Sequence, residues 1–473
     1  MKLTHSYQTL PALFYAPALP DQAPAPEMVV FNHDLAQTLG IDDSAPIADW
    51  CSGRALPPDA KPIAQAYAGH QFGQLNRLGD GRAVLLGEIQ TPNGLVDMQL
   101  KGSGRTPFSR HGDGKANLAP MLREYLLSEA LFALGIPTTR SLAVVKTGEA
   151  VRRKQHRQGA VLTRIASSHL RVGTFVFASI EAQRTGNLSL LQQLLDYTLA
   201  RHYPDWQTAD NPALALLERV IARQAQLMAQ WQGVGFIHGV MNTDNVTISG
   251  ETIDYGPCAF MDTYAEHTVF SSIDVQGRYA FGNQPPMMAW NMARFAESLL
   301  PLIDSDDEKA VALATQQVAQ FEPEYRRYWQ EQLCAKLGVP VTFASVAEEL
   351  LPLLYERQLD YTNTFVALTQ LAAGEPADLP TDAVFSGWLN AWQSQLHHDS
   401  VSQMQTHNPV VIPRNHQVEA ALQGAENGDL TAFYALHQVL QQPYDWQQLE
   451  ALTDYRRPAS AEWTRQYQTF CGT

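Results

Sequence analysis

The stretch from Gly235 to Gly256 constrains the fold of this chain more than any other part of the sequence. It reads Gly-Phe-Ile-His-Gly-Val-Met-Asn-Thr-Asp-Asn-Val-Thr-Ile-Ser-Gly-Glu-Thr-Ile-Asp-Tyr-Gly. Two short β-type runs, 246–248 and 252–253, flank a Ser-Gly turn and predict a small hairpin between two polar loops. Asn245 and Asp254 would then place one neutral and one anionic oxygen at its two ends, the hard ligands that Mg²⁺ prefers.

The order of these residues matches a protein-kinase catalytic loop followed by the metal-binding Asp-Phe-Gly. His238 and Asn245 are seven positions apart, as the His and the magnesium-binding Asn are in kinases, and Asp254 takes the place of the Asp-Phe-Gly aspartate. The catalytic aspartate of kinases would fall at Val240, which cannot accept a proton. Asp244 is the candidate base for a substrate that approaches from a different direction. Each motif alone is a common turn, so the prediction depends on their joint order and spacing.

The segment upstream predicts a small sheet with one helix. Residues 82–90 and 95–101 alternate as strands around the turn signal Asn93-Gly94, and Leu118 to Leu134 has helical spacing that Gly135 and Pro137 end. Two further strand-like runs follow at 141–146 and 160–165, and helical patterns then dominate the rest of the chain. We therefore expect an α+β, kinase-like two-lobed fold. The expected parts are an N-terminal arm over residues 1–60, an N-lobe over 61–166, a C-lobe over 167–330 and a helical extension over 331–473.

The predicted N-lobe supplies further kinase parts in order. A glycine turn, Gly79-Asp-Gly81-Arg82, opens the first strand, where backbone N–H groups can approach phosphate. Lys101 ends the second strand, and Glu124 in the following helix is its expected ion-pair partner, with Glu129 as second choice. Singly, these features also fit a hairpin turn, an edge lysine and a solvated helix face.

Two features do not belong to an ordinary kinase. A polar insert, residues 102–114, separates Lys101 from the helix, and Arg164 and Arg171 flank a Ser-Ser-His sequence after the last predicted strand. Arginines can grip a polyphosphate bidentately. The alternative is that both arginines bridge carboxylates of an acidic protein.

Charge and cysteine content exclude several classes of function. A net charge of −15 and a pI near 5.4 disfavour nucleic acid and anionic membranes as partners. The four cysteines form no Cys-x-x-Cys pair, which excludes the usual zinc and thioredoxin-like sites. Because prolines interrupt the N-terminal segment and no long apolar run follows, we expect a cytoplasmic protein without a membrane span.

Several long motifs resemble the selenoprotein O (YdiU) family over nearly the whole chain. They include Gly79-Asp-Gly-Arg82, Leu100-Lys-Gly-Ser-Gly104, Gly112-Asp-Gly114, His238 to Asn245, Asp254-Tyr-Gly-Pro-Cys258, Gly277 to Pro285, Asp360 to Phe365, Asn408-Pro and Arg414-Asn-His416. The resemblance implies a kinase fold that binds ATP in the reverse direction and transfers AMP to Ser, Thr or Tyr hydroxyls of target proteins, releasing pyrophosphate.

The resemblance also implies the role of each site residue. Asp244 would be the proton acceptor, and Asn245 and Asp254 would hold Mg²⁺, with Mn²⁺ as the alternative. The residues implied to contact ATP are Gly79, Gly81, Arg82, Lys101, Asp113, Gly114, Arg164, Arg171 and Asp254. The insert and the two arginines would form a cradle for the β- and γ-phosphates. We expect a monomer.

The tail departs from the family pattern, because some members end in selenocysteine and this chain ends Cys471-Gly-Thr473. Our hypothesis is a regulatory disulfide between Cys258 and Cys471, against the alternative of two inert thiols. Two other functions remain open for the chain. One is a kinase that uses Asp244 as base and transfers the γ-phosphate, and the other is an inactive nucleotide-binding scaffold.

Overall fold

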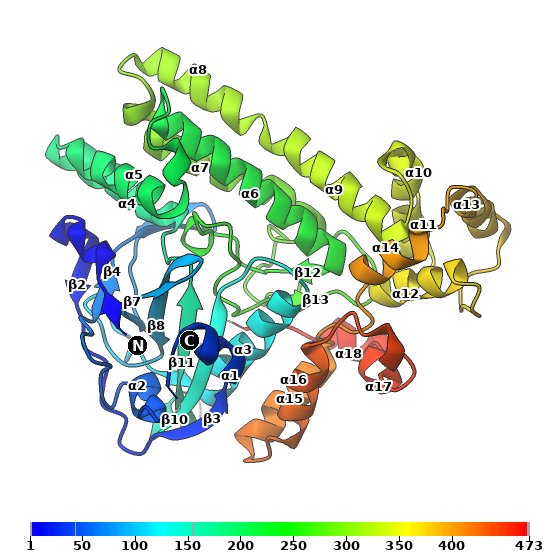
Figure 1. Ribbon diagram of the computed structural model, residues 1–473, viewed down its shortest axis with the longest axis horizontal. Helices are drawn as coiled ribbons and strands as arrows, with labels where there is room; N and C mark the ends of the chain where they lie inside the picture. Colours follow the sequence, from blue (N-terminus) through cyan, green and yellow to red (C-terminus); the bar gives the residue numbers. More distant parts are fainter. Residues whose placement is uncertain (1, 43, 154–155, 471–473) are drawn as a thin grey trace.

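An antiparallel sheet of nine strands forms the N-terminal part of the computed structural model, which describes residues 2–42, 44–153 and 156–470 (Figure 1). Its main order is β2-β4-β7-β8-β11-β10-β3, with β1 paired to β7 and β9 to β11. The strand bounds are β1 Leu3–Thr4, β2 Tyr15–Pro17, β3 Glu27–Phe31, β4 Ile63–Gln65, β7 Ala83–Thr91, β8 Gly94–Lys101, β9 Ala116–Asn117, β10 Arg140–Arg152 and β11 His156–Ala166. The first 31 residues thus contribute three of the strands.

The helix α3 (Leu118–Ala133) packs on this sheet and supplies its core. Leu122, Leu126 and Leu131 are fully buried, as their helical spacing predicts. Gly135 follows the helix with φ near 76°, a left-handed conformation that glycine adopts without steric cost. The predicted β7–β8 hairpin is also confirmed, with Gly94 opposite Thr91 at the turn. Lys101, at the end of β8, lies beside α3 and contacts Glu124 of this helix.

Helices form most of the remaining chain. Figure 1 shows α6, α7, α8 and α9 as long neighbouring rods above the sheet. Asn211 caps α6 by accepting a hydrogen bond from the N–H of Leu214, and Gly235 ends the helix in the left-handed conformation. The bounds in this region are α4 Val172–Thr185, α5 Ser189–His202, α6 Pro212–Val234, α7 Gln284–Ile303, α8 Asp307–Val318 and α9 Phe321–Leu337.

The last third of the chain is a set of shorter helices that returns to the sheet region. Its helices are α10 Ala344–Glu348, α11 Leu350–Glu356, α12 Tyr361–Ala372, α13 Ala383–Gln393, α14 Ser400–His407, α15 Asn415–Glu426, α16 Thr431–Leu440, α17 Thr453–Arg456 and α18 Ala461–Gln466. Helices α15 and α16 pack against α3. The α+β, kinase-like fold class is confirmed, whereas the four domain boundaries stay predictions.

The predicted hairpin at 246–253 is wrong. The run 246–248 lies beside 170–172: the N–H of Val172 donates to Val246, and the N–H of Ile248 donates to Leu170. Thr252 pairs instead with the segment around Thr138. The strand hydrogen bonds of both runs are thus made to distant segments, which the local pattern could not reveal.

Among the residues that the structure describes, no single helix is long and apolar enough to cross a membrane. One pair of helical segments, Asp307–Leu337 with Val341–Glu356, meets the criterion of length and composition but bends by 99° at its break.

The extension contains a buried lysine that provides a test of the packing. Lys336 is 2% exposed, its Nζ lies 4.1 Å from the centroid of the Phe365 ring, and no carboxylate pairs with it among the described residues. Burial lowers the pKa of its amine from 10.5 to about 7. Between pH 7 and 10.5 the unfolded chain holds a proton that the native state lacks, so stability should rise with pH over this window.

We expect Lys336→Met to remove this pH dependence. Methionine keeps a similar length without a charge to desolvate, so the variant should be more stable at pH 7. This advantage in stability should shrink between pH 7 and pH 10 by at most about 4 kcal/mol, since one pKa unit corresponds to about 1.4 kcal/mol. Urea unfolding of both proteins at several pH values measures the difference. A stability difference that stays constant with pH would contradict a neutral buried amine.

Candidate active site

All eleven residues predicted to bind ATP or metal or to act as base line one cavity of about 1560 Å³, together with Glu124. They are Gly79, Gly81, Arg82, Lys101, Asp113, Gly114, Arg164, Arg171, Asp244, Asn245 and Asp254. The N-terminal sheet, the loop after α6 and parts of the C-terminal extension all contribute to the wall. Of the proposed redox pair, Cys258 is buried and Cys471 lies outside the described residues.

Lys101 is held between two carboxylates on the sheet side of the cavity. Its Nζ lies 2.5 Å from Oε2 of Glu124 and 2.6 Å from Oδ1 of Asp254. The other choice, Glu129, binds Arg140 instead, at 2.7 Å. Burial alone would raise the pKa of Glu124, but Arg164 and Lys101 outweigh it and lower that pKa. The lysine is therefore fixed at the metal-binding end of the cavity.

Asp254 joins three cations in one network. Besides Lys101, it accepts from Arg164 at 2.7 Å through Oδ1 and from Arg171 at 3.3 Å through Oδ2. Burial by itself would raise the pKa of Asp254, but these three cations outweigh it and hold the pKa well below its usual range. Its φ of 65° lies in the left-handed region, which aspartate and asparagine tolerate better than most residues. The carboxylate is thus anionic and directed into the cavity.

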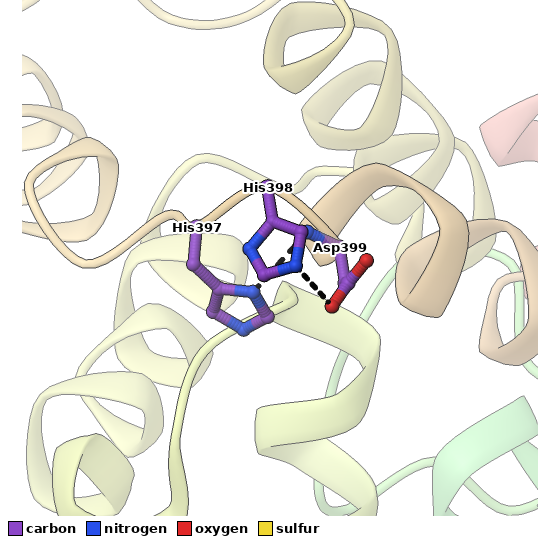
Figure 2. Close-up of side chains that lie close together, drawn as sticks. All are labelled: His397, His398 and Asp399. Atoms are coloured by element: carbon purple, nitrogen blue, oxygen red, sulfur yellow. Dashed lines mark hydrogen bonds and ion pairs between the residues drawn. The ribbon is translucent and has the colours of Figure 1, made fainter.

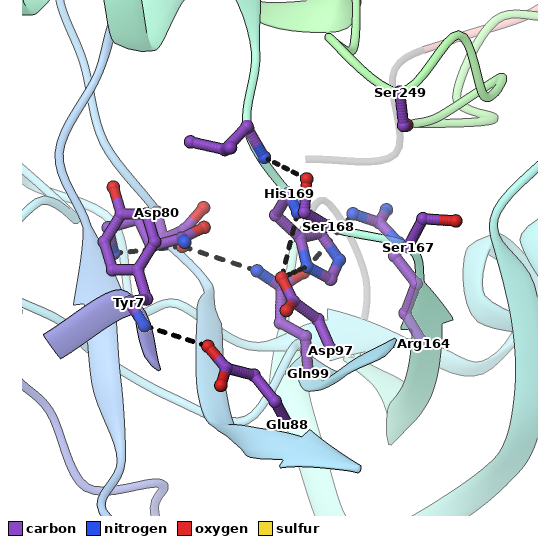
Figure 3. Close-up of polar contacts among 12 residues, drawn as sticks. Tyr7, Asp80, Glu88, Asp97, Gln99, Arg164, Ser167, Ser168, His169 and Ser249 are labelled. Atoms are coloured by element: carbon purple, nitrogen blue, oxygen red, sulfur yellow. Dashed lines mark hydrogen bonds and ion pairs between the residues drawn. The ribbon is translucent and has the colours of Figure 1, made fainter. Parts of the chain in front are cut away.

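The segment that carries Arg171 is fixed from behind by a buried polar network (Figure 3). The backbone N–H and Nδ1 of His169 both lie 2.9 Å from Oδ2 of Asp97 on β8. Arg201 of α5 donates to the other Asp97 oxygen at 2.6 Å and reaches Glu88 of β7 at 3.2 Å. Sheet and helices therefore set the position of Arg171 together.

Asp244 lies in the wall without the ion pairs that hold Asp254. Its Oδ1 is buried and has no hydrogen-bond partner within the described part of the chain. Burial raises the pKa of Asp244 to about 6. A Cβ on Gly69 would lie 2.3 Å from this oxygen, so only glycine leaves room for the carboxylate. A carboxylate with one unpartnered oxygen and a raised pKa is a candidate proton acceptor.

A short hairpin keeps the Asp244 loop in place. Strands β5 (Ala68–Gln71) and β6 (Gln74–Arg77) pair beside it, and the N–H of His70 donates to the hydroxyl of Thr243 at 2.8 Å. Asn245 directs its side-chain amide N–H to the carbonyl of Val240 at 3.1 Å. Its amide oxygen is then the atom left for a cation. Sequence reasoning missed this hairpin, whose short polar strands have little hydrophobic pattern.

The glycine turn and the polar insert form another part of the cavity wall. Gly79 has φ near 150°, and a Cβ there would lie 2.4 Å from the Phe108 ring of the insert. The Ser109 hydroxyl donates to the carbonyl of Gly81 at 2.5 Å, so the insert closes over the turn. Arg153 binds the carboxylate of Asp113 with both terminal nitrogens, at 2.8 and 3.1 Å, and lowers the pKa of Asp113. The insert and the glycine turn are therefore packed against each other.

Several cavity residues had no clear signal in the sequence. Asp80 lies between the two predicted glycines, is 2% exposed, and accepts from Arg171 at 3.4 Å. Arg123, Arg153 and Arg157 also line the cavity. The basic run Arg152-Arg-Lys154, followed by Arg157, was the sequence signal for the basic residues at this edge.

The donor set fits a hard divalent cation. Asn245 and Asp254 both line the cavity and contribute an amide oxygen and a carboxylate oxygen, the hard ligands that such a cation prefers. A second cluster with the spacing of metal ligands lies exposed between α13 and α14 and consists of His397, His398 and Asp399 (Figure 2). None of its three residues lines the cavity.

Comparisons with known proteins agree over the whole chain. The family model described as "Protein adenylyltransferase SelO" matches residues 1–441. A "Protein nucleotidyltransferase YdiU" of Geobacillus kaustophilus (strain HTA426) is 52% identical over 488 residues, which cover 100% of this chain and 99% of the relative. Proteins of the same name from Bacillus mycoides (strain KBAB4) and Bacillus cereus (strain AH820) are 50% and 51% identical, covering 100% of this chain and 98% of each relative.

Proposed function

The chain belongs to the SelO family of protein adenylyltransferases, and from this membership and its site we propose that it transfers AMP from ATP to hydroxyl groups of target proteins. The hydroxyl oxygen of a Ser, Thr or Tyr would bond to the α-phosphorus, and the bond to the β-phosphate would break. Pyrophosphate leaves, and the hydroxyl proton passes to Asp244. The observation that supports this assignment best is the buried, unpartnered Oδ1 of Asp244 in the wall that also holds Asn245 and Asp254.

Each group of cavity residues has a distinct task in this reaction. Asn245 and Asp254 would hold Mg²⁺ or Mn²⁺, and the ion would supply positive charge against the triphosphate. Lys101, Arg164 and Arg171 are the cations beside Asp254, and they are available to neutralise phosphate oxygens when ATP enters. The glycine turn with the insert would offer backbone N–H groups to the β- and γ-phosphates. The residue at the position of the kinase base is Val240, which cannot accept a proton. This favours Asp244 as the base.

The experiment that tests the proposal uses ATP labelled at either the α- or the γ-phosphate. With Mg²⁺ and a protein acceptor, we expect label on protein from α-labelled ATP only, and pyrophosphate as the second product. Label from γ-labelled ATP only would make the protein a kinase with an unusual base. Label from neither, despite ATP binding, would identify a scaffold. The monomeric state and the cytoplasmic location expected from the sequence stay predictions.

A further inference from the structure

The position of α3 determines how the cavity is assembled. Glu124 on this helix accepts from Lys101 through one oxygen and from Arg164 through the other, at 2.5 and 2.9 Å. A helix that shifted outward would withdraw both contacts and release the two cations from their places beside Asp254. Contacts that hold α3 in place therefore act on the site, and its polar contacts to the C-terminal extension lie at the wall of the same cavity.

The neighbouring residue Arg123 connects α3 to the C-terminal extension. It is 8% exposed, and its guanidinium has three partners from three different segments. It donates to Oε1 of Glu419 on α15 at 2.8 Å, to the hydroxyl of Tyr467 at 3.2 Å and to the carbonyl of Cys258 at 2.5 Å. The Tyr467 hydroxyl in turn donates to Glu419 at 2.9 Å, which closes the cluster.

The same helix α15 also holds the segment that follows Asp254. Asn415, at its first position, accepts from the N–H of Phe260 at 3.1 Å and donates to the carbonyl of Phe260 at 2.7 Å. The preceding residue, Arg414, is 1% exposed and donates to Asp262 at 2.6 Å. Residues 258–262 and helix α3 are therefore attached to one rigid element.

Apolar contacts run along the rest of α3. The ring of Tyr125 lies 5.3 Å from that of His437 and 6.4 Å from that of Phe433, both on α16. Tyr444 donates to the carbonyl of Leu134 at the end of α3, at 3.2 Å. Figure 1 shows α15 and α16 beside α3, on the side away from the long helices.

We propose that the cluster of Arg123, Glu419 and Tyr467 is a positioning device for the active site. Through it, the C-terminal extension holds α3 and the segment after Asp254 in the arrangement that forms the Lys101–Glu124 pair. The extension thus supplies within the chain the support that this helix needs before nucleotide binds. Its effect on catalysis rests on the proposed function, whereas its effect on Lys101 does not.

The test uses Glu419→Gln and Tyr467→Phe in the full-length protein. Glu419→Gln removes the negative charge opposite Arg123 and leaves only a neutral acceptor, and Tyr467→Phe removes the hydroxyl that contacts both Arg123 and Glu419; both changes leave the side-chain shape nearly unchanged. The Glu419 side chain is 43% exposed, so its replacement should cost little stability. We expect kcat for AMP transfer to fall about 10- to 100-fold, because a small displacement of positioned groups is enough for such a loss. The KM for ATP should change much less.

A second readout does not depend on transfer activity. Without nucleotide, reductive methylation of Lys101 and hydrogen exchange in α3 should both increase in the two variants, since the helix is less firmly held. In an Arg123→Gln/Glu419→Gln double variant, these effects should not exceed those of the more severe single variant, because the three residues act as a unit.

Arg140→Gln is the matched control. It removes an ion pair to Glu129 on the same helix, and Arg140 does not line the cavity and makes no ion pair to the described residues of the extension. It should lower the unfolding temperature while kcat and the labelling of Lys101 stay as in the parent protein. The proposal is overturned if Glu419→Gln and Tyr467→Phe behave like this control, with unchanged labelling and kcat. If the parent protein transfers no AMP, the labelling and exchange data still decide the positioning role.

Discussion

Asp254→Asn is expected to reduce transfer by about 10³-fold or more, since it removes the anionic ligand of the metal site and the partner of three cations. Asparagine suits the left-handed backbone at this position, where φ is 65°, so the fold should survive. The buried network loses one negative charge opposite Lys101, Arg164 and Arg171, and the cavity becomes more positive.

This change of charge predicts opposite effects on the affinity for ATP without metal and on the gain in affinity that Mg²⁺ provides. ATP without metal should bind the variant at least as tightly as the parent protein, while the gain in affinity on adding Mg²⁺ should disappear. Calorimetric titration with and without Mg²⁺ measures both quantities. The control is Glu426→Gln, which also removes a carboxylate from the cavity wall but leaves the Asp254 network intact. If Asp254→Asn kept the metal-dependent gain in affinity, Asp254 would not be a metal ligand.

Asp244→Asn should lower kcat by about 10²- to 10⁴-fold, the usual contribution of a positioned general base. Oδ1 of Asp244 has no hydrogen-bond partner among the described residues, so the isosteric amide should cost little stability. Binding of ATP and metal should stay close to that of the parent protein. Transfer from α-labelled ATP, with ATP affinity measured in parallel, separates the loss of chemistry from a loss of binding.

Thr243→Val is the control for the same loop. It removes the hydroxyl that accepts from the N–H of His70, and so disturbs the packing of the loop against β5 without removing a carboxylate. We expect a smaller loss of kcat than for Asp244→Asn. Equal rates for Asp244→Asn and the parent protein would rule out Asp244 as the proton acceptor and require another base in the cavity.

Much of the N-terminal region and most of the candidate site could be predicted from the sequence. The β7–β8 hairpin follows from local alternation around Asn93-Gly94, and α3 from its helical spacing, because in both cases the partner residues are close in the chain. The site motifs could be placed in order because a kinase-like arrangement fixes their spacing. The wrong hairpin at 246–253 shows the limit, since its strand hydrogen bonds are made to residues 137–139 and 170–172.

The sequence by itself determined the fold class, the family motifs and eleven of the residues that line the cavity. Only the tertiary structure decided which charges meet there. Glu124, rather than Glu129, faces Lys101, because α3 packs on β10 and β11 with Glu124 directed to Lys101 at the end of β8 and Glu129 directed to Arg140. The role of Arg123 could not be predicted from the sequence either, because its partners Glu419 and Tyr467 lie about 300 residues or more further along the chain. Local patterns report the burial of a side chain, but the partner of a buried charge is set by long-range packing.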